Sequence, residues 1–232
     1  GLGHAVGPAG DVNGDGIDDV IVGFRNGVNS KAGTARVHSG ADGVALYTFT
    51  GNSPAAFFGQ AVDGAGDVNA DGYADVIIGA VGEDANGIDA GAAYVLSGRD
   101  GSQLHKFVGD GTKTRFGGAV SGAGDVNGDG FDDVIAGAQP DTAPGFARLF
   151  SGADGSVLFS FAGASIVSRL GCAVDLAGDV NGDGVGDLVI GDWRDPTGIT
   201  GGGSVSVFSG ASGGLLFRRF GDKANDRLGS AV

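Results

Sequence analysis

The stretch that decides the fold is Asp11–Asp19, Asp-Val-Asn-Gly-Asp-Gly-Ile-Asp-Asp, which is followed at once by Val20–Gly23, Val-Ile-Val-Gly. A similar acidic loop begins again at Asp67, Asp125 and Asp179, at offsets of 56, 58 and 54 residues. Each copy precedes a short aliphatic run that ends in glycine. A repeat of this length is typical of architectures that stack one supersecondary unit many times. The chain is therefore expected to be a repeat protein.

Each loop presents oxygen atoms at alternate positions around a glycine, which is how a chain wraps a calcium ion. Three carboxylates so close together repel one another unless a divalent cation neutralises them. The sequence therefore predicts four Ca²⁺ sites, each with four side chains and one main-chain carbonyl as ligands. The four sets, with the carbonyl donor in fourth place, are Asp11, Asn13, Asp15, Ile17 and Asp19; Asp67, Asn69, Asp71, Tyr73 and Asp75; Asp125, Asn127, Asp129, Phe131 and Asp133; and Asp179, Asn181, Asp183, Val185 and Asp187.

Two alternatives compete with this interpretation of the loops. Asn, Asp and Gly favour turns by themselves, so four metal-free turns are one alternative, which the recurrence of four intact copies disfavours. An EF-hand or dockerin loop begins similarly, but an EF-hand loop needs a glutamate at its twelfth position and flanking helices. Here that position holds Val22, Ile78, Ala136 and Ile190, within aliphatic runs that indicate buried strands. The loop is therefore expected to join strand to strand.

The composition bounds the class of protein and its partners. A chain of 232 residues can bury one substantial core, and 50 glycines with no helical periodicity indicate many tight turns. The net charge is −14, and twelve of the 28 acidic residues are proposed calcium ligands, so four bound ions would bring the charge to about −6. With 14 Lys and Arg and no basic stripe, a nucleic-acid partner is not expected.

Cysteine and calcium together point to a compartment. Cys172 is the only cysteine, so there is no internal disulfide, and calcium would supply the cross-links instead. Weak calcium loops fill where calcium is millimolar, so the chain is expected to be secreted and to lie outside the cell or at the cell surface. There is no signal peptide and no apolar span of 18 residues, so membrane insertion is not expected. Both ends lie at the same phase of the repeat, which indicates a segment of a longer array.

Superposition of the copies predicts four strands in each repeat, with the acidic loop between the first and second. The repeats are expected at about 1–56, 57–114, 115–168 and 169–226, with a surplus strand at 227–232. The first strand of each unit is expected at Leu2–Val6, Phe58–Val62, Phe116–Val120, Leu170–Val174 and, as the surplus copy, Leu228–Val232. A four-stranded antiparallel unit cannot cover both of its faces alone, and radial stacking of such units gives a β-propeller. The predicted fold is therefore all-β, a single propeller or propeller segment.

The order of these motifs resembles a known family. Phe-Gly, then Gly-Asp-Val-Asn-Gly-Asp-Gly-x-x-Asp, then Val-Ile-x-Gly-Ala, is similar to the FG-GAP repeat, the blade unit of the integrin alpha-subunit propeller and of many secreted bacterial proteins. The resemblance covers all four repeats and implies a propeller with calcium in the loops between the first two strands of each blade. The departures from the pattern are Leu2, Phe24, Ala70, Leu170 and Asp192, none of which is a proposed ligand.

Recognition is expected on the rim opposite the acidic loops. Consecutive turns of an antiparallel blade alternate between two rims, and the loops of this second rim differ among the repeats, as recognition loops on a rigid scaffold do. Trp193, Arg194 and Arg25 are the candidate ligand contacts there, although a lone tryptophan in a loop also packs against its neighbours. The weaker charged candidates on this rim are Lys31, Glu83 and Asp84.

Catalytic groups are not indicated. His38 and His105 fall where the other repeats have Leu or aromatic residues, so they are expected to substitute for packed side chains. His4 and Cys172 share a position that Gly118 fills in another repeat, which does not suggest a nucleophile. There is no Ser/His/Asp or Cys/His constellation, so the chain is not expected to be an enzyme.

Three functions remain open from the sequence. The first is a calcium-stabilised adhesion, scaffold or protein-interaction module. The second is a lectin-like or substrate-presenting propeller attached to a secreted enzyme, and the third is a purely structural array segment. In each case the partner, protein or glycan, is expected at the rim opposite the calcium loops, and open blade edges allow self-association.

Overall fold

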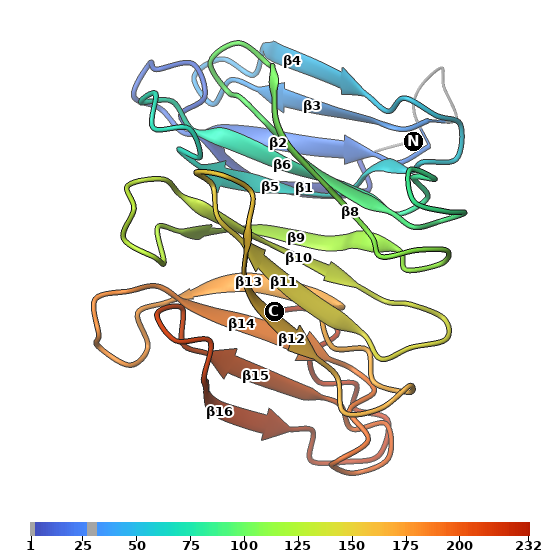
Figure 1. Cartoon of the computed structure of the whole chain (residues 1–232). Helices are drawn as coiled ribbons and strands as arrows, with labels where there is room; N and C mark the ends of the chain where they lie inside the picture. Colours follow the sequence, from blue (N-terminus) through green and yellow to red (C-terminus); the bar gives the residue numbers. More distant parts are fainter. Residues whose placement is uncertain (1–2, 27–31) are drawn as a thin grey trace.

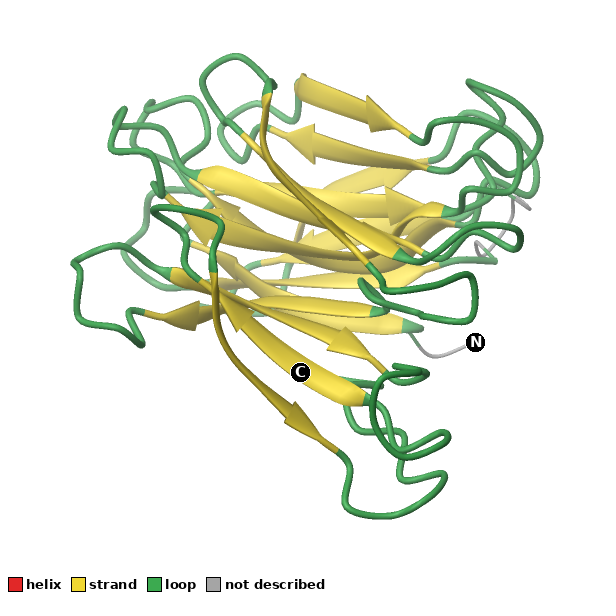
Figure 2. Cartoon of the chain, turned by 60° about the horizontal axis from the view of Figure 1, so that its bottom comes forward, coloured by secondary structure: helices red, strands yellow, loops and turns green. Residues whose placement is uncertain are grey.

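The computed structural model describes residues 3–26 and 32–232, and within these ranges every regular element is a β-strand (Figures 1 and 2). Leu2 and Lys31 lie outside the described residues. The strands form four separate sheets of four strands, each antiparallel and ordered as in the sequence. This confirms the predicted all-β fold built of four-stranded antiparallel blades.

Each sheet draws its strands from one continuous stretch of chain. The first contains β1 (Ala5–Gly10), β2 (Asp19–Phe24), β3 (Thr34–His38) and β4 (Ala45–Thr50). The second contains β5 (Phe58–Gly66), β6 (Asp75–Ala80), β7 (Ala92–Leu96) and β8 (Gln103–Val108). The third contains β9 (Phe116–Gly124), β10 (Asp133–Ala138), β11 (Phe146–Phe150) and β12 (Val157–Ala162). The fourth contains β13 (Ala173–Gly178), β14 (Asp187–Asp192), β15 (Ser204–Phe208) and β16 (Leu215–Phe220).

The first strand of each blade differs from the predicted bounds. Strands β5 and β9 run on to Gly66 and Gly124, because a register shift lets each of these glycines, at positive φ, pair with the aspartate that begins the next strand. Strand β13 begins only at Ala173, because its pairing with β14 starts at Ala173 and Gly191, whereas Phe58 and Phe116 already pair with Ala80 and Ala138. The predicted strand start at Leu170 was therefore wrong. The predicted start at Leu2 lies outside the described residues.

The surplus strand predicted at Leu228–Val232 is not formed. Leu228 makes one isolated parallel bridge to Gly203, and no strand continues from it. Phe58 and Phe116 make the equivalent bridges to Gly33 and Gly91 before they enter β5 and β9. Leu228 therefore occupies the repeat position of Phe58 and Phe116 but does not begin a strand.

The four sheets lie side by side as the blades of a β-propeller. Strands β1, β5, β9 and β13 are the innermost of their sheets and contact one another in that order (Figure 1). Three clusters of buried apolar side chains fill the spaces between consecutive blades. Successive side chains of a strand point to opposite faces, so Ile78 packs towards the first blade and Ile77 towards the third. Strand β6 is therefore buried along its whole length.

The outward faces of the first and last blades are not covered by another sheet. Val20 in β2 is 39% exposed, whereas its counterpart Val76 in β6 is 1% exposed. Val180, in the acidic loop of the last blade, is 47% exposed, whereas Val12 in the first blade is 1% exposed. Val76 is thus buried because the first blade covers its face of β6, and Val12 is buried because the second blade covers its face of the first blade. Val20 and Val180 have no such neighbouring blade.

A close approach of two backbones explains the paired glycines of each repeat. A Cβ atom on Gly79, which ends the aliphatic run of β6, would collide with the carbonyl oxygen of Gly117 in β9. Gly117 itself has φ of +80° and would collide with the carbonyl oxygen of Ala92. The glycine of Phe-Gly and the glycine of the aliphatic run are therefore required at one contact between neighbouring blades.

Candidate metal loops and the opposite rim

Each acidic loop is closed by hydrogen bonds from its own backbone to its own side chains. In the first loop, Asp11 Oδ1 accepts from Gly14 N at 2.7 Å and Asp15 N at 3.1 Å, and Asp11 Oδ2 accepts from Gly16 N at 2.8 Å. Asn13 Oδ1 accepts from Asp15 N at 2.9 Å, and Asp15 Oδ1 accepts from Ile17 N at 2.9 Å. The first, third and fifth side chains therefore accept hydrogen bonds from the backbone of their own loop.

The same arrangement recurs in the other three loops. The first aspartate of each accepts from the N–H groups of the fifth and sixth residues, as Asp67, Asp125 and Asp179 do. The asparagine of each accepts from the following aspartate N–H. The carbonyl positions of the four loops are Ile17, Tyr73, Phe131 and Val185, whose N–H groups all donate to the aspartate two residues earlier.

The last aspartate of each loop is the first residue of the next strand and is buried. Asp75 is 0% exposed; its Oδ2 accepts from Val68 N at 2.8 Å and its Oδ1 accepts from Gly98 N at 3.0 Å. Gly98 belongs to the turn between β7 and β8, so this carboxylate joins the acidic loop to the neighbouring turn of the same rim. The counterparts that do the same are Asp19 with Gly40, Asp133 with Gly152 and Asp187 with Gly210.

The electrostatics of two loops favour a cation. Burial raises the pKa of Asp75 to about 6, and the charges of Asp71 and Asp67 add to the rise. Burial likewise raises the pKa of Asp133 to about 6, with the charges of its own loop adding to it. Both carboxylates are thus held close to other anions in a poorly solvated place. A divalent ion in the loop would offset that repulsion.

The donor set fits calcium in its chemistry, while the side chains are not gathered around a common centre. Each loop supplies three carboxylates, one amide oxygen and one carbonyl, the hard oxygen ligands that Ca²⁺ takes. Among the described residues, however, no group of three or more His, Cys, Asp or Glu side chains is placed so as to hold a metal ion. The structure therefore brings the predicted ligands of each set into one loop but does not bring their carboxylates into a ligand shell.

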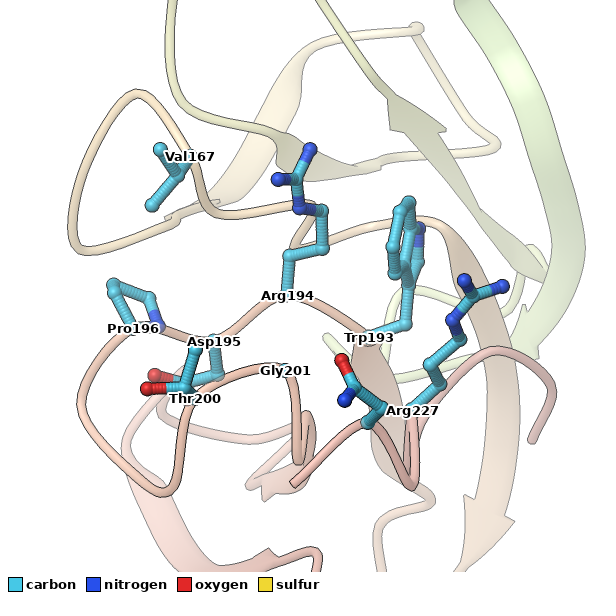
Figure 3. Close-up of a pocket in the computed structure, with 9 residues that line it drawn as sticks. Val167, Trp193, Arg194, Asp195, Pro196, Thr200, Gly201 and Arg227 are labelled. Carbon is cyan, nitrogen blue, oxygen red and sulfur yellow. The ribbon is translucent and has the colours of Figure 1, made fainter.

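The opposite rim carries a cavity at the predicted tryptophan. Trp193, Arg194, Asp195, Pro196, Thr200 and Gly201 line a space of about 560 Å³ together with Val167, Asn225 and Arg227 (Figure 3). The guanidinium carbons of Arg194 and Arg227 lie 5.3 and 5.4 Å from the Trp193 ring centroid. Trp193 and Arg194, both predicted as contacts, thus share one site, which we call the Trp193 cavity.

Arg227 is the second arginine of this site, and the sequence did not single it out. It precedes Leu228-Gly229, as Phe57 precedes Phe58-Gly59 in the second repeat, and this phase of the repeat could have identified it. Phe57, Arg115 and Arg227, which all hold this repeat position, line cavities of the second rim. In the fourth repeat the same position is Arg169.

Arg25 lies in a separate, smaller cavity of the same rim. This cavity of about 290 Å³ is lined by Arg25, Phe57, Gln60, Val81, Arg115, Gly118 and Gln139. Arg25 Nη1 donates to Gln60 Oε1 at 3.3 Å, and its guanidinium carbon lies 5.9 Å from the Phe57 ring centroid. The structure therefore does not bring Arg25 together with Trp193 and Arg194.

The weaker candidates have local structural partners. Glu83 is buried and forms an ion pair of 3.2 Å with Lys106, and Asp84 Oδ1 accepts from Asp89 N at 2.8 Å. His105 Nε2 lies 2.6 Å from Gly152 O, and its ring stacks on Phe107 at 5.7 Å. His38 Nδ1 lies 3.1 Å from Gly43 O.

Cys172 is partly buried, and its thiol contacts two backbone carbonyls. Its Sγ donates to Gly229 O at 3.0 Å and to Gly191 O at 3.4 Å. Burial raises the pKa of Cys172 to about 11. At neutral pH the thiol therefore stays protonated, which is unfavourable for a nucleophile.

The described part of the chain contains no helix that is long and apolar enough to cross a membrane.

Comparison with known proteins gives a consistent family. The FG-GAP repeat family model matches residues 2–38 and 116–158. Integrin alpha-V of Gallus gallus is 30% identical over 207 residues, which cover 82% of this chain and 20% of the integrin. Integrin alpha-5 of Xenopus laevis is 29% identical over 200 residues, which cover 78% of this chain and 19% of the integrin. The chain thus spans about a fifth of the length of these curated relatives.

A solved structure agrees on the fold. The crystal structure of rhamnogalacturonan lyase YesW superposes with a TM-score of 0.51 over 93% of this chain and 50% of the lyase, at 16% identity. At that identity the likeness concerns the fold alone. Together, the four antiparallel sheets, the repeated acidic loops and the matched repeats support an integrin-like FG-GAP repeat protein with a β-propeller fold.

Proposed function

We propose that this chain is a calcium-binding, non-catalytic β-propeller that acts outside the cell as an adhesion or protein-interaction module. The observation that carries the proposal is the recurrence of one complete oxygen-donor set in all four blades, each at the junction of two strands. A metal-free turn would need only one or two of these residues, whereas five donors are present each time.

The position of the loops supports a structural role for calcium. Ala74 N donates to Asp11 O at 3.1 Å, and Asp132 N donates to Asp67 O at 3.1 Å, so the loops of neighbouring blades are bonded to one another. Asp132 Oδ2 also accepts from Asp67 N at 2.8 Å. An ion that orders one loop would therefore order the edge of the next blade as well.

The side chains with catalytic potential support a non-catalytic role. His38 and His105 contact backbone carbonyls, and the partly buried thiol of Cys172 has a raised pKa. Neither pairs with a second titratable group in a cavity, as a nucleophile and its base would. The integrin relatives support adhesion and a location at the cell surface, where millimolar calcium would fill weak loops.

The second rim is the proposed contact surface for the partner. It carries the two cavities that contain Trp193 and Arg25, while the acidic loops occupy the other rim. A partner, protein or glycan, can therefore bind without displacing calcium.

The experiment is a binding screen with a built-in test for turnover. The chain is immobilised and incubated with matrix proteins and glycans in Ca²⁺ or in EGTA, and every bound component is then analysed for cleavage. The proposal expects retention that depends on calcium and components that are recovered intact. Cleavage that disappears on a point substitution in the second rim would contradict it, as would retention that is equal in EGTA.

A further inference from the structure

The Trp193 cavity is lined by three segments that meet at the second rim. The connection between β14 and β15 supplies most of the lining, the turn after β16 supplies Asn225 and Arg227, and the connection between β12 and β13 supplies Val167. Figure 3 shows the indole ring between the guanidinium groups of Arg194 and Arg227. At about 560 Å³ the cavity lies within the range of small-molecule sites, which runs from roughly 300 to 1,000 Å³.

The two guanidinium groups carry positive charge that the protein does not neutralise. Four ion pairs occur in the described ranges, and none of them includes Arg194 or Arg227. The nearby Asp226 is turned to its own loop, where its Oδ2 accepts from Lys223 N at 2.8 Å. A guanidinium presents a planar fork of donors that binds a carboxylate with two parallel hydrogen bonds.

The loop that presents Arg194 is held in place by two buried carboxylates. Asp192 accepts hydrogen bonds from Arg169 N at 2.7 Å, Arg194 N at 3.1 Å and Ser168 Oγ. Asp195 accepts from Ser204 Oγ at 2.6 Å and from Thr197. These acidic groups are occupied inside the protein, and the loop is fixed before a ligand arrives. Fixed recognition groups lose less entropy on binding.

Asp195 also remains an anion without cancelling the charge of the cavity. Burial acts to raise its pKa, but hydrogen bonds from Ser204 and Thr197 outweigh burial and hold the pKa below its ordinary value. Its charge is balanced by Arg218, whose Nη1 lies 3.4 Å from Asp195 Oδ2. Arg194 and Arg227 therefore keep their charge for a ligand.

Arginine recurs along this rim at one position of the repeat. Arg115, Arg169 and Arg227 each precede the Phe-Gly or Leu-Gly pair of consecutive units. Arg115 is half exposed in an ion pair of 2.9 Å with Asp141, and Arg169 Nη1 donates to the carbonyls of Ile166 and Ser168. Asp141 balances the charge of Arg115, whereas Arg169 and Arg227, which belong to consecutive units, take part in none of the ion pairs of the described ranges. Two such cations one blade apart suit a linear ligand with repeated anionic groups better than one isolated acidic side chain.

We propose that the Trp193 cavity binds an acidic polysaccharide through the carboxylates of its uronate residues. Arg194 and Arg227 bind the carboxylates, and Thr200 and Asn225, which also line the cavity, supply polar groups as partners for sugar hydroxyls. The apolar surfaces of Val167 and Pro196 complete its lining. This inference rests on the proposed interaction function and specifies the ligand class.

The test measures binding of three probes by isothermal titration calorimetry to the whole chain in Ca²⁺. The probes are a galacturonate hexasaccharide, its fully methyl-esterified form and an acidic peptide of six glutamates. The expected result is binding of the hexasaccharide alone, because the ester keeps the sugar and removes the charge.

Arg194→Gln and Arg227→Gln are each expected to weaken hexasaccharide binding about tenfold, as loss of a charge-assisted pair does. The matched control is Arg99→Gln, which removes the same charge from the other rim, where Arg99 lies 5.5 Å from the Tyr73 ring. The affinity of Arg99→Gln for the hexasaccharide should equal that of the wild type. All three variants should have the same melting temperature as the wild type.

Several outcomes overturn the inference. If the glutamate peptide binds and the hexasaccharide does not, the ligand of this cavity is an acidic protein and not a glycan. If the methyl ester binds as tightly as the hexasaccharide, the carboxylates do not contribute to binding. Affinity that is unchanged in both cavity variants places the ligand elsewhere, and absence of binding to a folded, calcium-loaded chain removes it altogether. If calcium-dependent retention of another component persists in the screen above, the proposed function stands while this inference fails.

Discussion

At the scale of single residues, the backbone conformation explains why each loop position holds the residue it does. The fourth position of the acidic loop has φ of +75° at Gly14, +74° at Gly128 and +77° at Gly182, a region that suits glycine. In the second loop the same position is Ala70, at φ of +56°. The departure visible in the sequence is thus a strained residue and not a changed ligand.

Ala70→Gly is therefore expected to stabilise the protein by about 1 kcal/mol, because glycine adopts this conformation without the penalty that a Cβ brings. The measurement is the free energy of unfolding from urea titration. The control is Ala41→Gly, at an exposed turn residue that is not at positive φ, where about 0.5–1 kcal/mol should be lost. Destabilisation by Ala70→Gly would contradict the account.

Cys172 gives a second prediction at this scale. Burial raises its pKa from 9.0 to about 11, so the thiolate at pH 8 is about a hundredfold scarcer than for an ordinary thiol. Iodoacetamide should therefore modify the native chain at least about a hundredfold more slowly than the urea-unfolded chain, as followed by mass spectrometry. The native rate should rise with pH up to about 11. Equal rates in both states would show that the thiol is exposed.

At the scale of elements, the sequence predicted the second strand of each blade well and the first strand poorly. The aliphatic runs after Asp19, Asp75, Asp133 and Asp187 are strands, because a continuous β-branched run fits a sheet covered on both faces. The first strands end in Gly10, Gly66, Gly124 and Gly178, where register shifts extend the pairing. A bulge is set by the partner strand, so one strand's own sequence does not show it.

The functional residues divide in the same way. The acidic loops are local in sequence, so all twenty predicted donors could be named before the structure. The Trp193 cavity joins residues 193–201 to Asn225 and Arg227 across a blade, and only the fold brings them together. Arg25 aligns with Trp193 but belongs to the first blade, whereas Trp193 belongs to the fourth, so the two residues lie in different cavities.

The contact between blades predicts a large effect of one methyl group. Gly79→Ala is expected to destabilise the protein by about 3 kcal/mol or more, because the added Cβ meets a backbone carbonyl that cannot move aside. The control is Gly111→Ala, where no atom lies within 4 Å of the added Cβ and the change should stay within about 0.5 kcal/mol. Equal melting temperatures for both variants would contradict the packing described.

At the scale of the whole molecule, the fold separates two surfaces. One rim carries the acidic loops and the other carries the arginine-containing cavities. Between the blades the core consists of three apolar layers, while the first and last blades each keep one uncovered face. The sequence predicted the repeats and their radial stacking, but it also predicted a surplus strand that the structure lacks.

Calcium is expected to stabilise the whole propeller, since an ion that binds only the native loops adds stability by mass action. Melting in excess EGTA should therefore occur more than about ten degrees below melting in millimolar Ca²⁺. Circular dichroism follows the transition, and equal concentrations of Mg²⁺ serve as the control, because the loops offer the larger, flexible shell of calcium. Coincident melts in EGTA and Ca²⁺ would count against a structural role.

The most direct test of the account is the number of calcium ions that the chain binds. Isothermal titration of the chelator-treated protein should give about four ions for each chain, one for each acidic loop. Asp129→Ala, at an exposed ligand position of the third loop, should lower that number to about three and leave the fold intact. A chain that is folded and binds no calcium would contradict the central claim.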